Sequence, residues 1–138
     1  MEKYIPVVVI KELSETDKIL TALKHSGINT AEITFRTACA AEAIAYACKN
    51  YPDMSIGAGT VINAAQCEAA LAAGAQFIVS PGLSALKALS GPFPQVKFIP
   101  TGGVDRSNID EFLAFDKIAA IGGSFFVKEA LEKMEAEK

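Results

Sequence analysis

The chain has 138 residues, of which 51% are hydrophobic, and a formal net charge of -3 at pH 7. This length and composition predict one domain with a buried core. Because basic residues are neither in excess nor clustered, we expect no nucleic-acid partner. No apolar run is long enough to span a membrane and no signal-peptide pattern is present, so we expect a cytoplasmic protein that does not bind membranes.

Apolar β-rich runs alternate with helical patterns along the whole chain, giving six βα units. Strands are expected at residues 5–10, 30–35, 55–59, 76–80, 96–99 and 118–121. Helices are expected at residues 17–26, up to 48, from about 63 to 74, briefly at 84–90, at 108–115 and in the charged tail up to 138. Residues 14–17 match a capping box ahead of the first helix.

Strict alternation of apolar strands and helices predicts an α/β protein with a parallel sheet and right-handed crossovers. Two architectures fit, a barrel of βα units and a doubly wound open sheet. A (βα)₈ barrel normally has about 250 residues, and this chain is two units short. Both architectures bind ligands at the carboxyl ends of the strands, where candidate site residues can be sought.

The second expected strand has an entirely polar face. A period of two places Thr30, Glu32, Thr34 and Arg36 on it. A solvent-facing edge strand would explain this, but in a covered parallel sheet a mid-strand carboxylate is costly unless it is paired. We therefore predict that Glu32 is a general acid/base and that Arg36 binds a carboxylate or phosphate. The alternative is a structural ion pair between them.

Further candidates follow the next strands. Thr60 presents a hydroxyl at the end of the third strand, with a helix cap as its alternative role. Residues 80–82 either border a site or only form a turn. Paired glycines follow the last two strands, and backbone N–H groups of such turns can hold a phosphate, although they can equally serve only to turn the chain. These residues are Gly102, Gly103, Gly122 and Gly123, with Ser124 next to the second pair.

Metal and cofactor chemistry have little support in the sequence. The three cysteines form no CxxC pair, and the single histidine, His25, has no ligand spacing around it. His25 is expected on the surface near a helix C-terminus. We therefore predict no metal and no cofactor.

Six motifs occur in the order found in one enzyme family. They are residues 32–36, 57–61, 77–82, 91–94, 100–103 and 121–124. With them the chain resembles the 2-keto-3-deoxy-6-phosphogluconate (KDPG) aldolases, a family that includes the 4-hydroxy-2-oxoglutarate (KHG) aldolases. The resemblance extends over roughly residues 5–128.

The resemblance implies a trimeric class I aldolase on a (βα)₈ barrel that needs no metal. In the family a lysine forms a Schiff base with the substrate ketone, and KDPG is cleaved to pyruvate and glyceraldehyde 3-phosphate. Glu32 then corresponds to the acid/base that shuttles the proton. The remaining roles implied are pyruvyl contacts for Arg36 and Thr60, a pyruvyl wall for Pro81, and phosphate binding for Gly102, Gly103, Gly122, Gly123 and Ser124.

One departure from the family is large. Between Leu83 and Ser84 the chain passes from the end of the family's fourth strand to the helix after its sixth, and the Schiff-base lysine belongs to that sixth strand. Lys97 begins a similar Lys-Phe-Ile-Pro run, but Thr-Gly-Gly follows it, so it matches the phosphate strand and lies at the wrong end. Lys11, after the first strand, is the alternative nucleophile.

We therefore predict a single (βα)₆ domain over residues 1–138, a truncated TIM-barrel derivative, with a rearranged doubly wound sheet as the alternative. Exposed strand edges favour a homo-oligomer formed by edge pairing or swapping. The predicted function is binding of a small anionic or phosphorylated keto acid with little or no aldolase activity. The alternative is a non-catalytic, self-associating folding module, an engineered or evolutionary-intermediate barrel fragment.

Overall fold

The structure, a computed structural model, describes residues 5–82, 87–89, 91–101, 105–114, 118 and 125–137. Its parallel strands are β1 (Val7–Val8), β2 (Thr30–Thr34), β3 (Ser55–Gly59), β4 (Ile78–Pro81) and β5 (Phe98–Thr101). Its helices are α1 (Glu15–His25), α2 (Ala40–Asn50), α3 (Ala64–Ala72), α5 (Ile109–Leu113) and α6 (Phe125–Ala136).

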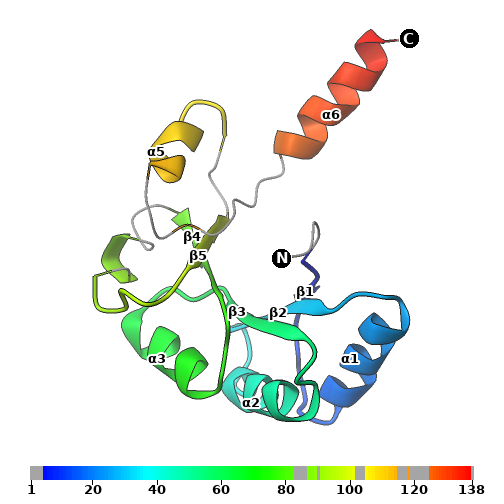
Figure 1. The fold of residues 1–138 in the computed structure, drawn as a ribbon, viewed down its shortest axis with the longest axis vertical. Helices are drawn as coiled ribbons and strands as arrows, with labels where there is room; N and C mark the ends of the chain where they lie inside the picture. Colours follow the sequence, from blue (N-terminus) through cyan, green and yellow to red (C-terminus); the bar gives the residue numbers. More distant parts are fainter. Residues whose placement is uncertain are drawn as a thin grey trace.

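The five strands lie in the sheet in the order in which they occur in the chain. Helices α1, α2 and α3 lie side by side along one face of this sheet (Figure 1). A doubly wound sheet reverses its strand order at a switch point and carries helices on both faces. The sequential order is instead that of a barrel wall, so the rearranged open sheet does not describe these strands.

The main core lies between the sheet and α1–α3. The strands contribute fully buried side chains from alternate positions, among them Ile33, Ile56, Ile78 and Phe98. Each such side chain stabilises the fold by about 1.5–3 kcal/mol through burial. A smaller cluster of Phe77, Val79 and Ile99, with Ile5 against it, covers part of the opposite face, which we call the inner face.

Two local expectations are wrong. The first strand is expected over residues 5–10, but only Val7–Val8 pair, and they pair with β2 alone among the described strands. The expected capping box is absent, because Ser14 has a helical backbone and its side chain makes no capping bond. Instead the Glu15 carboxylate accepts hydrogen bonds from the N–H groups of Lys11 and Glu12 at 3.0 and 3.3 Å. Helix α1 begins at Glu15, two residues before the expected start.

The last expected βα unit is described only in part. Ile118 makes a parallel bridge to Phe98, which places it on the far side of β5 from β4. Residues 119–121 lie outside the described residues, as do Leu83 and Ser84, where the internal shortening is predicted. The short helix expected at 84–90 is helical at residues 87–89.

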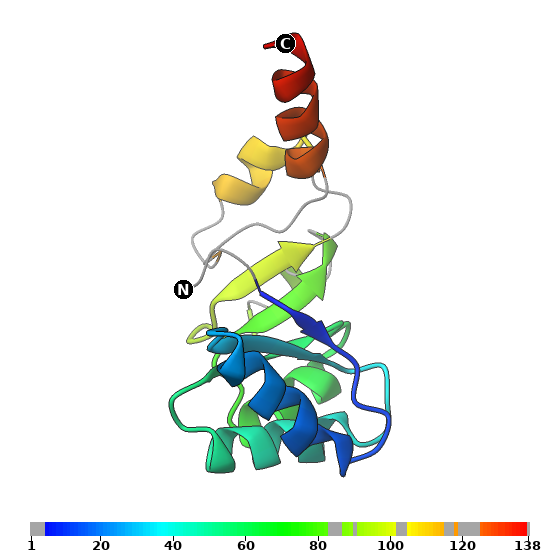
Figure 2. The ribbon, with the colours of Figure 1, turned by 90° about the vertical axis from the view of Figure 1, so that its right-hand side faces the viewer.

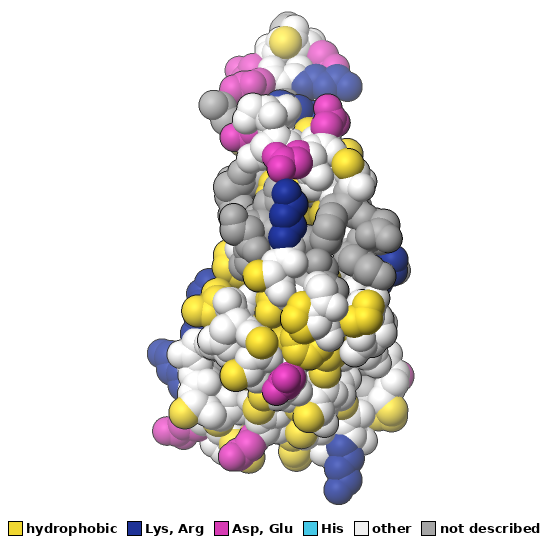
Figure 3. All heavy atoms as spheres, turned by 90° about the vertical axis from the view of Figure 1, so that its left-hand side faces the viewer, with side chains coloured by type: hydrophobic (Ala, Val, Ile, Leu, Met, Phe, Trp, Pro, Cys, Tyr) yellow, Lys and Arg dark blue, Asp and Glu magenta, His cyan; other side chains and the backbone are white. Residues whose placement is uncertain are grey.

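Helix α6 extends away from the sheet in both ribbon views (Figures 1 and 2). Its side chains Leu131 and Met134 are 58% and 59% exposed, respectively. On the face shown in Figure 3, the described acidic and basic side chains are scattered, and no continuous basic patch is visible. None of the described helices is both long and apolar enough to cross a membrane.

Candidate active site

Glu32 is the central charged group of the inner face. It lies in the middle of β2, between β1 and β3, and is only 7% exposed. Thr30 and Thr34, on the same face, are also buried. The polar face of β2 is therefore enclosed, and the alternative of a solvent-facing edge strand is wrong.

Burial controls the protonation of Glu32. Desolvation raises the pKa of its carboxyl, and the charge of Arg36 lowers it by a smaller amount. Arg36 itself is exposed, beyond the end of β2. A carboxylic acid with a raised pKa can both hold and release a proton closer to neutral pH, which is what a general acid/base requires.

Two glycines of β3 make room for the side chains of the inner face. A Cβ atom on Gly59 would overlap the carboxylate of Glu32, and one on Gly57 would overlap the ring of Phe77. The strand register pairs Gly57 with Glu32 and Gly59 with Thr34. The Glu32 side chain therefore leans along β2 towards the level of Thr34, over a residue that has no side chain.

Thr60 follows β3 in an unusual backbone conformation. Its φ angle is 54°, in the left-handed region that β-branched residues rarely adopt. Such a conformation costs about 1–3 kcal/mol and is found most often at functional sites. The helix cap predicted as its alternative role is wrong, because Asn63 caps α3 by accepting a hydrogen bond from the Gln66 N–H at 2.9 Å.

The other predicted site residues have different surroundings. Pro81 ends β4, is exposed and pairs in register with Thr101. Ser80 is fully buried, and its hydroxyl donates to the carbonyl of Val61 at 3.0 Å, so it has a structural role. The predicted phosphate-binding residues, Gly102, Gly103, Gly122, Gly123 and Ser124, lie outside the described residues.

The described strands carry no lysine. Lys97 is exposed and directly precedes β5, at the end away from the expected ligand site. Lys11 is exposed after β1. Within the described part of the chain, no group of three or more His, Cys, Asp and Glu side chains is arranged to hold a metal ion.

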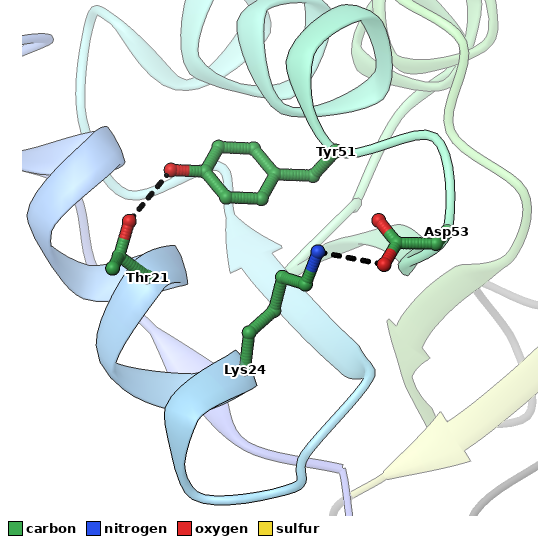
Figure 4. A network of polar contacts seen from close by, with 4 residues as sticks. All are labelled: Thr21, Lys24, Tyr51 and Asp53. Carbon is green, nitrogen blue, oxygen red and sulfur yellow. Dashed lines mark hydrogen bonds and ion pairs between the residues drawn. The ribbon is translucent and has the colours of Figure 1, made fainter.

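A second polar cluster lies at the amino ends of β2 and β3 (Figure 4). The ammonium of Lys24 is 2.6 Å from the Asp53 carboxylate, and the hydroxyls of Thr21 and Tyr51 are 2.9 Å apart. Tyr51 also donates to the carboxylate of Asp17. These contacts tie α1 to the segment after α2. The adjacent His25 is exposed at the end of α1, as predicted.

We expect the stability of the protein to depend on pH through Glu32. Because its folded-state pKa is raised above the ordinary value of 4.5, its contribution to stability is fully present below that value and is lost as pH rises through the folded pKa. Glu32→Gln carries no titrating proton and should lack this loss. Urea unfolding of both proteins from pH 4 to pH 8 measures the difference. Parallel stability profiles would contradict the buried-carboxyl interpretation.

The sequential parallel sheet, with an enclosed carboxylate on its inner face, defines an α/β protein of the TIM-barrel kind. The family model of the KDPG and KHG aldolases matches residues 1–86 and 82–138. The KHG/KDPG aldolase of Escherichia coli (strain K12) is 33% identical over 176 residues, which cover 93% of this chain and 83% of the relative. The 2-dehydro-3-deoxy-phosphogluconate aldolase of Dickeya dadantii is 31% identical over 182 residues, covering 97% and 85%. The chain belongs to the KDPG/KHG aldolase family.

Solved structures agree with this assignment. The KDPG aldolase of Legionella pneumophila, captured with pyruvate as a covalent carbinolamine intermediate, is 35% identical with a TM-score of 0.58, covering 95% of this chain and 87% of that one. The enzyme of Zymomonas mobilis is 31% identical with a TM-score of 0.55, covering 88% and 81%. The resemblance predicted from the sequence motifs is confirmed.

Proposed function

We propose that this chain is an internally shortened member of the family that binds a small keto acid but has little or no aldolase activity. The observation that carries the proposal is that Glu32, a candidate acid/base, is enclosed in a sheet whose described strands carry no lysine to form a Schiff base. The site would hold a pyruvyl group, or the phosphorylated keto acid KDPG, without cleaving it to pyruvate and glyceraldehyde 3-phosphate.

The lengths of the alignments support the shortening. The alignments to the relatives of E. coli and D. dadantii extend over 176 and 182 residues, more than the 138 residues of this chain. The relatives therefore carry residues that have no counterpart here. The family model matches in two segments that meet at residues 82–86, which fits a deletion between Leu83 and Ser84 in a single (βα)₆ domain.

The roles proposed for the individual residues are those that the family resemblance implies. Glu32 is the acid/base, Arg36 and Thr60 contact the carboxylate end of the keto acid, and Pro81 forms a wall beside it. The left-handed backbone of Thr60 at the carboxyl end of β3 supports this placement. Phosphate binding is proposed for Gly102, Gly103, Gly122, Gly123 and Ser124.

We expect borohydride treatment in the presence of pyruvate to leave the intact mass of this chain unchanged. A Schiff base would be reduced to a stable pyruvyl adduct, as expected for a lysine-bearing aldolase of the family, which serves as the positive control. An adduct on Lys11 or any other lysine would overturn the claim of inactivity.

Binding is tested separately from chemistry. Pyruvate, inorganic phosphate or a sugar phosphate that binds only the folded state must raise the thermal midpoint, by an amount that grows with ligand concentration. No shift at saturating ligand would favour the second candidate, a self-associating folding module.

The exposed apolar side chains support that second candidate. Val7 in β1 is 59% exposed, and the side chains of Leu131 and Met134 in α6 are exposed to a similar extent. We propose a cytoplasmic homo-oligomer in which a second copy covers the edge of β1 that pairs with no other described strand. A molar mass in solution equal to that of one chain would contradict it.

A further inference from the structure

The ring of Phe77 lies over Gly57 on the inner face. A Cβ atom on Gly57 would overlap three atoms of this ring, so the ring occupies the place that a side chain of β3 would take. Phe77 directly precedes β4 and is buried. Its carbonyl accepts a hydrogen bond from the Ala58 N–H at 3.0 Å, which holds its backbone against β3. The aromatic side chain therefore leans from β4 over the middle of β3.

The strand register puts this ring at the level of Glu32. Gly57 pairs with Glu32 across β2 and β3. Neighbouring strands lie about 4.8 Å apart, so the ring is about one strand spacing from the Glu32 side chain. The ring fills the space over Gly57, and the Glu32 carboxylate lies over the next glycine of the inner face, Gly59. The carboxylate is thus directed towards the carboxyl ends of the strands, where a barrel of this kind binds its ligands.

Phe77 also belongs to the apolar cover of the inner face. It clusters with one side chain each of β4 and β5, and Ile5, which precedes β1, packs against that cluster. The cluster therefore joins the two sides of the β2–β3 pair. Val7, the β1 residue that pairs with Glu32, is mostly exposed and gives the carboxylate little cover. Among the described residues, Phe77 is a large apolar side chain that shields Glu32 from water.

We propose that Phe77 is a positioning residue of the site, whose ring holds the Glu32 carboxyl over Gly59 and keeps water from its amino-end side. The inference rests on the acid/base role proposed above for Glu32. Desolvation is the larger influence on the pKa of Glu32, and the charge of Arg36 is the smaller one. Strands β1, β3 and β4 carry no titratable side chain. Removing the ring should therefore lower the pKa of Glu32 towards its ordinary value of 4.5.

Phe93 provides a matched control. It is also a buried phenylalanine, but it belongs to the main core between the sheet and the helices. Replacing either phenylalanine with leucine removes a buried ring and keeps an apolar side chain. Both changes therefore weaken packing, whereas only the change at Phe77 uncovers the space over Gly57.

The experiment compares Phe77→Leu and Phe93→Leu with the wild type. An NMR titration of the Glu32 carboxyl carbon measures its pKa, thermal unfolding measures stability, and a second NMR titration measures binding of pyruvate. Both variants should unfold at a temperature lower by about 3–6 °C. Phe77→Leu should in addition lower the pKa of Glu32 and bind pyruvate about tenfold more weakly. Phe93→Leu should leave the pKa and the affinity as they are in the wild type.

The other results separate this inference from the proposed function. If Phe77→Leu leaves the pKa of Glu32 unchanged, or if Phe93→Leu lowers it equally, the inference is overturned and the proposed function stands. If the wild type binds no pyruvate but Phe77→Leu alone lowers the pKa, the positioning role stands and keto-acid binding is overturned. Should Phe77→Leu not fold, Phe77→Met keeps most of the volume without the flat ring, and the same comparison applies.

Discussion

Replacing Gly59 with alanine is expected to displace the Glu32 carboxylate and to lower the free energy of unfolding by about 1–3 kcal/mol. The new Cβ would overlap the carboxylate and the atoms next to it, so the buried side chain must move. Because Glu32 is then no longer aligned over the inner face, binding of keto acid should be lost as well. Urea unfolding and an NMR titration with pyruvate measure the two effects.

Gly91→Ala is the control for this substitution. Apart from Gly91 itself and its two chain neighbours, no described atom lies within 4 Å of the position of its Cβ, and its backbone is outside the left-handed region. Its stability should stay within about 0.5 kcal/mol of the wild type. A double-mutant cycle sharpens the test, since Gly59→Ala should cost less when Glu32 is already alanine. Additive effects would mean that the two residues do not share this space.

Phe98→Ala should cause the largest loss of stability, about 3–5 kcal/mol. Phe98 is the largest of the fully buried side chains, and its strand β5 pairs with β4 on one side and bridges Ile118 on the other. A typical domain is stable by only about 5–15 kcal/mol, so this cavity would remove a large part of the total. Chemical denaturation monitored by circular dichroism gives the value.

Leu113→Ala is the matched control for the loss of an apolar side chain. Leu113 is 61% exposed, so its truncation should change stability by less than about 0.5 kcal/mol. A loss below about 1 kcal/mol for Phe98→Ala would fall well short of the cost of a buried cavity. It would mean that β5 is not part of the same cooperative core as β2 and β3.

The elements governed by local pattern were predictable from the sequence. The bounds of β3 agree with the expected residues 55–59, and the polar face of β2 predicted an enclosed carboxylate at Glu32. The family resemblance also rested on short motifs in order. The register that brings Glu32 to Gly59 was not predictable, because it depends on how β2 and β3 align across the sheet.

Other features depend on contacts that no local pattern encodes. At the start of α1 the Glu15 side chain, and not Ser14, accepts hydrogen bonds from backbone N–H groups, those of Lys11 and Glu12. The left-handed backbone of Thr60 could not be predicted from the sequence, because β-branched residues normally avoid that conformation. Thr34 was recognisable as part of the polar face of β2, but the sequence does not show that its buried hydroxyl has no hydrogen-bond partner among the described residues.

The order of the strands has a consequence for how such a chain folds and varies. Each described strand pairs with a strand that adjoins it in the chain, and the connections from β1 to β4 each carry one helix. Because each described pairing joins strands that are consecutive in the chain, the N-terminal strands can pair before the C-terminal ones are made. The sequential order also means that the sheet is built from repeated βα units. Whole βα units can be gained or lost at one place without changing the register of any pairing elsewhere, and β2 and β3, with Glu32 and Gly59, form a unit that such changes leave intact.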